Sequence, residues 1–314
     1  MNRTNFFIFF TFLLTFSGCT STLVDRTSPL TTTQRLQYLI PAKSNIEIIP
    51  LLSVGEPAHN GYRLVGLPDG LGAYDNDDDT FTLFVNHEIN QKSGIVRSHG
   101  GKGAFISKWI ITKPSHADGA FKVLSGEDAI HRFFEWDSKE KKYTPVKRSL
   151  TRLCSADLAH PDAFYFKGIG AESRLFLSGE ENDAYFEGNY GTAIATIVDG
   201  PLAGNTYELP HMGNMSFENI VASPFPQEKT VVIALDDPAG KSIETFGEIY
   251  VYIGKKQNRG NPIEKAGLTN GNLYGIAIDD LPVESWNDGL DGFTERRFEL
   301  KLLEDVEFDD GTKL

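Results

Sequence analysis

Hydrophobic residues occur along this chain in short runs, and several runs end in a cluster of acidic residues. Four such runs are Phe81–Glu88 (FTLFVNHE), Leu175–Glu181 (LFLSGEE), Val231–Asp237 (VVIALDD) and Leu273–Asp280 (LYGIAIDD). A short apolar run bounded by turn residues is typical of a buried strand. Acidic groups that crowd together repel one another and lose hydration, and a bound cation is the usual compensation. The pattern therefore predicts a β-rich scaffold that holds metal, provided that these strand ends meet in the fold.

The expected strands fall into units of about four, which is the plan of a β-propeller blade. The clearest unit has strands at Phe217–Ala222, Thr230–Leu235, Glu248–Gly254 and Leu273–Ile278. An earlier unit has strands at Ala163–Phe166, Arg174–Leu177, Thr192–Val198 and Asn205–Leu209. A looser unit before it has strands at Arg63–Leu67, Phe81–Val85, Ala104–Thr112 and His131–Trp136. We therefore expect an all-β fold of the β-propeller type, with a two-sheet sandwich as the alternative.

Chain length and charge restrict the class of protein further. Two or three blades cannot close a propeller, which needs about four to eight. Because Phe298–Leu303 begins what looks like another unit, we expect a piece of a longer protein or an unusually short member of its class. The 314 residues include 43 acidic and 30 basic side chains, which gives a net charge of −13 and a pI of about 5.0. Without a basic stripe to neutralise phosphates, a nucleic-acid partner is excluded, and we expect a monomer.

The N-terminus predicts export and lipid anchoring. A basic start and an apolar stretch at 6–16, too short to span a bilayer, precede Ser17-Gly18-Cys19. This order resembles a bacterial lipobox, so residues 1–18 are expected to be a lipoprotein signal peptide and Cys19 the lipidated residue. A plain signal peptide with an incidental cysteine is the alternative. Residues 19–44 are then a tether and 45–314 the propeller domain, located in the cell envelope at the outer membrane, facing the periplasm, or secreted.

Candidate metal ligands lie at the predicted strand ends. Glu88 follows Asn86 and His87 at a predicted strand end. An imidazole beside a carboxylate suits a metal site or an acid–base pair, and the alternative interpretation is a solvated strand end. Glu181 follows Glu180 and precedes Asn182 and Asp183, so that four oxygen donors occur in four residues. The alternative interpretation is an exposed acidic turn. Hard cations such as Ca²⁺ take six to eight oxygen ligands.

Two further candidates lie within apolar surroundings. Glu218, in the stretch MSFENIVA, needs a cation or an arginine nearby if it is buried. Cys154 is either a small buried hydrophobic residue or a thiolate ligand for iron or zinc. The acidic run Asp75–Asp79 lacks the spacing of an EF-hand and is interpreted mainly as a hairpin turn. The paired acids Asp236 and Asp237 repeat the strand-end motif.

Several stretches together resemble the bacterial PhoX-type alkaline phosphatase family, over about residues 45–280. In order they are GYRLVGLPDGLGAYDNDDDTFTLFVNHE, RLCSADLAHPDAFYF, RLFLSGEE, YELPHMGNMSFENIVASP, KTVVIALDD, GEIYVYIGKK and KAGLTNGNLYG. The resemblance implies a six-bladed propeller whose central cluster contains iron and calcium and which hydrolyses small phosphomonoesters. It implies Cys154 as an iron-binding thiolate, and Glu181, Glu218 and, less directly, Glu88 as metal-binding carboxylates. The sequence assigns no catalytic residue.

Two departures from the family pattern keep other functions open. Cys154 lies in Leu-Cys-Ser-Ala-Asp, where better-known members have Asn-Cys-Ala-Gly-Gly, and this chain has no later Arg-Pro-Glu motif. One alternative is a non-catalytic, calcium-stabilised surface propeller that binds a ligand or partner. The other is a phytase-like hydrolase that depends on calcium alone. The chain has no Gly-x-Ser-x-Gly motif and no phosphate-binding P-loop, which argues against a serine hydrolase and an NTPase.

Overall fold

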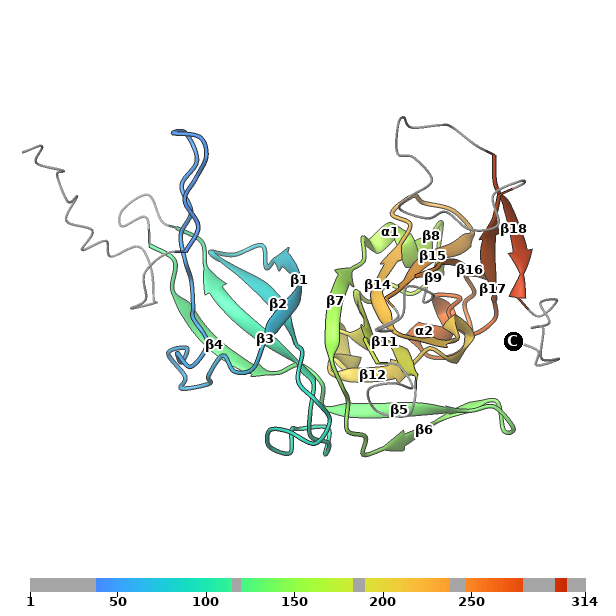
Figure 1. Ribbon diagram of the computed structural model, residues 1–314, viewed down its shortest axis with the longest axis horizontal. Coiled ribbons are helices and arrows are strands. Elements are labelled where there is room, and N and C mark those ends of the chain that lie inside the picture. The colour runs from blue at the N-terminus through green and yellow to red at the C-terminus, as the bar shows by residue number, and fades with distance from the viewer. Residues whose placement is uncertain (1–37, 115–119, 183–189, 238–246, 279–296, 304–314) are drawn as a thin grey trace, which may run out of the picture.

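The computed structural model describes residues 38–114, 120–182, 190–237, 247–278 and 297–303, and most of their regular structure is β-strand (Figure 1). The predicted signal peptide, Cys19 and the acidic residues Asp183, Asp279 and Asp280 lie outside the described residues. Within the described part, no helix combines the length and the apolar composition needed to cross a membrane.

The first sheet is an antiparallel meander in the order β1-β2-β3-β4. Its strands are β1 (Pro68–Asp75), β2 (Thr80–His87), β3 (Phe105–Thr112) and β4 (Val123–Asp128). The acidic run at 75–79 joins β1 to β2 as a hairpin turn, in which the Asp78 carboxylate accepts a 2.7 Å hydrogen bond from the Thr80 amide. The hairpin interpretation of this run is therefore confirmed.

The second sheet lies next along the chain and has the order β6-β5-β12-β11-β10-β7. Its main strands are β7 (Leu153–Leu158), β10 (Leu175–Glu180), β11 (Gly191–Ile197) and β12 (Asn205–Glu208). The hairpin of β5 (Arg132–Asp137) and β6 (Lys142–Val146) extends it, with β5 parallel to β12. The short elements are β13 (Asn214–Met215), which pairs with β11, α1 (Pro161–Phe164), the two-stranded β8 (Tyr165–Phe166) and β9 (Ile169–Gly170), and the 3-10 helices η1 (Gly200–Leu202) and η2 (Pro210–Met212).

The third sheet is another antiparallel meander, in the order β14-β15-β16-β17-β18. Its strands are β14 (Phe217–Ala222), β15 (Lys229–Asp236), β16 (Ile249–Lys255), β17 (Asn272–Ala277) and β18 (Glu299–Leu302), with α2 (Pro262–Lys265) between β16 and β17. Helix α2 is closed by a capping box, in which Asn261 and Glu264 satisfy each other's backbone amides.

Apolar side chains pack the three sheets face to face in sequence. Phe84 of the first sheet contacts Phe176 of the second, with ring centroids 5.6 Å apart. Leu177 of the second sheet belongs to one buried cluster with Phe217 and Val232 of the third. Strand β7 contacts both β1 and β14, so these three strands, one from each sheet, lie side by side. We call β1, β7 and β14 the inner strands. The prediction of an all-β, propeller-type fold is therefore confirmed, and the two-sheet sandwich is wrong.

The predicted strands of the third sheet are confirmed to within one residue at either end, but four other predictions are wrong. The strand expected at 131–136 in the first unit is β5 of the second sheet, and 298–303, expected to begin another unit, contains β18 of the third sheet. Residues 63–67 form no strand beyond a single bridge at Arg63, and the first strand begins at Pro68. Residues 163–166 end helix α1 and form the two-residue strand β8, because Pro161 and the His160 side chain start a helical turn there. The strand that carries Cys154, β7, was not expected from its polar sequence.

Candidate metal centre

The three sheets repeat one hydrogen-bond pattern at the start of their inner strands. The first residue of each inner strand pairs with the last residue of the strand beside it, in the pairs Pro68 with His87, Leu153 with Glu180, and Phe217 with Asp236. In each sheet, the residue that follows the neighbouring strand donates its amide to the carbonyl of the residue that precedes the inner strand. These hydrogen bonds are 2.9 Å from Glu88 to Leu67, 2.9 Å from Glu181 to Arg152 and 2.8 Å from Asp237 to Ser216. The blades are thus structurally equivalent here, although their sequences differ.

Each inner strand also departs from regular pairing at its second residue. The strand register shifts between Pro68 and Leu71, between Ser178 and Glu180 opposite β7, and between Phe217 and Asn219. A bulge of this kind leaves a residue outside the ladder and redirects its side chain. The second residues are Asp69, Cys154 and Glu218.

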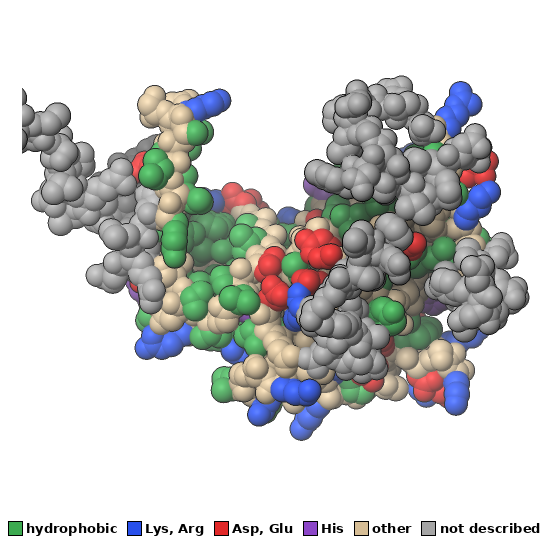
Figure 2. Space-filling model, in the orientation of Figure 1, with side chains coloured by type: hydrophobic (Ala, Val, Ile, Leu, Met, Phe, Trp, Pro, Cys, Tyr) green, Lys and Arg blue, Asp and Glu red, His purple; other side chains and the backbone are tan. Residues whose placement is uncertain are grey.

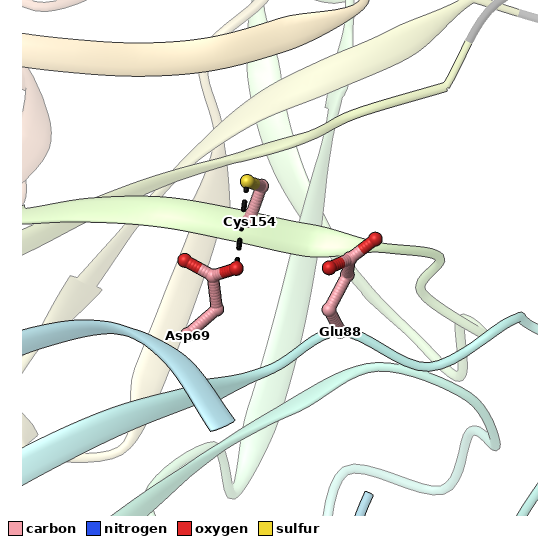
Figure 3. Close-up of side chains that lie close together, drawn as sticks. All are labelled: Asp69, Glu88 and Cys154. Atoms are coloured by element: carbon pink, nitrogen blue, oxygen red, sulfur yellow. Dashed lines mark hydrogen bonds between the residues drawn. The ribbon is translucent and has the colours of Figure 1, made fainter. Parts of the chain in front are cut away.

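The bulges and the strand ends bring five potential metal ligands together from three sheets. The Cys154 thiol lies 3.7 Å from an oxygen of Asp69 and 3.5 Å from an oxygen of Glu218. Donor atoms of Asp69, Glu88 and Cys154 lie within 4.8 Å of one another, and so do those of Cys154, Glu181 and Glu218. Figure 3 shows the first group, with Asp69 at the start of β1, Cys154 on β7 and Glu88 after the end of β2. We call these five residues the donor cluster.

An arginine, Arg152, contacts the donor cluster. The guanidinium of Arg152 is 3.2 Å from the Glu88 carboxylate through Nε and makes a close contact to the Glu181 carboxylate through Nη2. Arg152 thus pairs with two of the four carboxylates. Figure 2 shows acidic side chains gathered near the middle of one face of the molecule, with a basic side chain beside them.

Burial disfavours the ionised forms of Glu88, Glu181 and Cys154. Loss of hydration raises the pKa of Glu88 and of Glu181, although Arg152 opposes this change at both. The pKa of the Cys154 thiol is raised far above its ordinary value, first by burial and then by the charges of Asp69 and Glu218. A multivalent cation would reverse this balance, because it stabilises carboxylates and thiolates by direct coordination.

Buried polar groups hold the strand that carries Cys154. The Asn86 amide nitrogen donates to the carbonyls of Cys154 at 2.9 Å and Ser155 at 3.0 Å, while its oxygen accepts a 3.1 Å hydrogen bond from Ser178. Gly70 permits close approach of β1, since a Cβ atom there would lie 2.4 Å from the backbone nitrogen of Ala156. The donor cluster is therefore built on rigid strands.

Three expected site residues have other roles in the fold. The ring nitrogens of His87 lie 2.6 Å from the Val65 carbonyl and 2.7 Å from the Ser107 hydroxyl, and burial lowers the pKa of His87 to about 4. The expected acid–base pair of His87 and Glu88 is therefore not formed. Glu180 is buried against Arg148, at 2.8 Å. Asp237 is exposed and belongs to neither group of close donor atoms.

The structure brings together all four ligands expected from the sequence, Glu88, Cys154, Glu181 and Glu218, and adds Asp69. Asp69 was missed because Leu-Pro-Asp-Gly has the composition of a turn. A combination of one thiol with four carboxylates fits both iron, which accepts thiolate, and calcium, which prefers oxygen. The donor types of the cluster therefore fit the metals that the family resemblance implies.

No protein-family model matches this sequence, and no curated protein matches it. The chain is similar to a solved structure of Pseudomonas fluorescens PhoX in complex with vanadate, a transition state analogue, with a TM-score of 0.46 and 12% sequence identity. The aligned part covers 72% of this chain and 51% of that chain, so this chain spans about half the length of the solved structure.

Proposed function

We propose that the donor cluster binds iron and calcium and that the protein is a metal-dependent phosphomonoesterase of the cell envelope. The observation that carries the metal site is the convergence of four carboxylates and a thiol, with Arg152 as the cation that contacts two of them. Uncompensated charges of one sign in a partly buried site cost several kcal/mol each. Bound cations remove that cost, and the substrate class follows the sequence resemblance.

The residues of the donor cluster differ in the metal that their donor atoms suit. Cys154 supplies the soft thiolate ligand that iron accepts, whereas Asp69, Glu88, Glu181 and Glu218 supply the oxygens that calcium prefers. When bound, such metals polarise phosphate oxygens and lower the pKa of water. Arg152 is suited to a further task, since a guanidinium displaced from Glu88 and Glu181 can donate two parallel hydrogen bonds to a phosphate.

The position of the thiol favours iron over a calcium-only, phytase-like hydrolase or a calcium-stabilised binding protein. Cys154 belongs to both groups of close donor atoms, so its sulfur lies at the middle of the cluster. A site for calcium alone gains nothing from a sulfur ligand, because calcium binds oxygen. Cys154→Ser therefore distinguishes the proposals.

The test is the metal content, by mass spectrometry, of protein lacking residues 1–19 and purified without chelators. We expect iron together with calcium, loss of iron in Cys154→Ser, and loss of hydrolysis of p-nitrophenyl phosphate in the same variant. Asp79→Asn, in the exposed hairpin between β1 and β2, is the matched control and should retain both metals. Calcium alone, with Cys154→Ser unaffected, would favour the phytase-like or binding alternatives.

Anchoring through Cys19 is a separate proposal that the same protein permits us to test. Full-length protein is expected in the membrane fraction of a bacterial host, and Cys19→Ala is expected to abolish acylation. Retention of Cys19→Ala in the membrane with unchanged mass would contradict the lipoprotein assignment. The released domain should sediment as a monomer.

A further inference from the structure

A second polar site lies outside the donor cluster, between the segment 98–100 and the β5–β6 hairpin. It is a cavity of about 340 Å³, near the lower end of the range for small-molecule sites. Its apolar wall includes Phe133, Pro145 and Val146, and none of its lining residues belongs to the donor cluster.

One wall of the cavity contains a buried imidazole, His99, that is poorly satisfied by hydrogen bonds among the described residues. His99 is 4% exposed, and neither of its ring nitrogens makes a hydrogen bond of normal geometry. The backbone carbonyl of Arg148 lies close enough to favour the protonated ring, whereas burial lowers the pKa of His99. Buried polar side chains are normally satisfied, so a ligand in the cavity is a natural partner for this ring.

The charged side chains around the cavity are predominantly basic. Arg132 and Lys147 line it, are exposed, and make no ion pair with any described residue. The nearby acid, Asp128, is already bonded to the Tyr62 hydroxyl at 2.6 Å and to the Ser98 amide at 3.0 Å. It also forms an ion pair with Arg97 at 3.2 Å. Two unpaired cations beside a compensated carboxylate favour a negatively charged ligand.

We propose that this cavity binds a small organic oxyanion, a phosphate or carboxylate attached to a compact apolar group. Arg132 and Lys147 bind the anionic oxygens, His99 supplies a buried hydrogen bond, and Pro145 and Val146 contact the apolar group. The site goes beyond the proposed phosphatase centre and takes its ligand without a metal.

The test is isothermal titration of the full chain, as purified, with phenylphosphonate and with benzoate. Phenylphosphonate is not hydrolysed, and comparison of the two probes separates the phosphate class from the carboxylate class. We expect binding of at least one probe, and at least a tenfold loss of its affinity in the double variant Arg132→Gln/Lys147→Gln. The matched control is Lys139→Gln/Lys142→Gln, which removes the same charge from the same hairpin but not from the cavity wall.

Two further measurements keep this site distinct from the donor cluster. Binding should persist after metal removal with a chelator, and His99→Phe should weaken it while leaving the melting temperature near that of the parent. The proposal is overturned if neither probe binds at millimolar concentration, or if both charge-removing variants bind equally well. It is also overturned if binding disappears with the metals and is insensitive to Arg132 and Lys147.

Discussion

Two adjacent glutamates at the end of β10 should respond to mutation in opposite ways. Glu180 is 4% exposed and accepts three hydrogen bonds, from Arg148 at 2.8 Å, the Thr151 amide at 2.9 Å and the Thr192 hydroxyl at 2.6 Å. Glu181 points instead into the donor cluster. We predict that Glu180→Gln lowers stability and leaves metal binding intact, whereas Glu181→Gln has the converse effect.

The size of the stability loss expected for Glu180→Gln follows from the burial of Glu180. Removing one partner of a buried ion pair costs about 3–5 kcal/mol because the other charge is left uncompensated. In a domain of this size each kcal/mol lowers Tm by roughly 2–4 °C. The Glu180→Gln variant should therefore melt roughly 6–20 °C below the parent, while its folded fraction retains iron and calcium.

The direction of the stability change expected for Glu181→Gln follows from the raised pKa of Glu181. Loss of hydration raises that pKa in the folded state, so the folded, metal-free protein binds this proton more readily than the unfolded chain does. Stability of the metal-free protein should then increase as pH falls from neutrality toward the raised pKa. Glu181→Gln removes the ionised group, so it should leave the metal-free Tm equal or higher and flatten this pH dependence.

The assay is thermal denaturation with and without chelator, combined with metal content by mass spectrometry. Glu181→Gln should lose the stabilisation that metal gives the parent, whereas Glu180→Gln should keep it. The reasoning fails if Glu181→Gln lowers the metal-free Tm as much as Glu180→Gln does. It fails equally if folded Glu180→Gln protein contains no metal.

Three further predictions test the scaffold. Gly70→Ala should destabilise the protein by about 1–3 kcal/mol in urea denaturation, because its Cβ would lie 2.4 Å from the Ala156 nitrogen; unchanged stability would show that β1 and β7 can separate. Asn86→Asp should reduce iron content and stability together, since it places an acceptor against the Cys154 carbonyl; retention of both would exclude a positioning role. Burial lowers the pKa of Lys256 to about 8, so between about pH 8 and pH 10 the unfolded chain holds this proton and the folded protein does not. The stability of the parent relative to Lys256→Met should therefore rise over this range of pH. A fall in relative stability would contradict the burial of the amine.

The sequence predicted the strands best where apolar residues alternate or cluster. The run KTVVIALD at 229–236 forms β15 as expected, because β-branched residues fill both faces of a strand with packed neighbours. The prediction was poor where the inner strands begin. Pro68, Asp69 and Gly70 have the composition of a turn, yet they start β1, because the neighbouring strand β7 packs closely against it and requires a small residue there.

Part of the site was predictable from the sequence for the same reason. Glu88 and Glu181 each follow a strongly apolar strand, so local patterning alone places a carboxylate at the strand end. The same pattern also suggested His87, Glu180 and Asp237, and it could not distinguish them from true members of the cluster. That distinction depends on which side of the strand each residue faces and on which sheet lies opposite.

The sequence by itself determined an acidic, strand-rich chain with carboxylates at strand ends, since composition and periodicity are local properties. Only the tertiary structure decided which of these groups meet. Asp69, Cys154 and Glu218 are separated by 85 and 64 residues, and hydrogen-bond geometry places them together through equivalent bulges in three sheets. Such convergence is set by register and by packing between sheets, which depend on contacts across the whole chain and leave no pattern in any one segment.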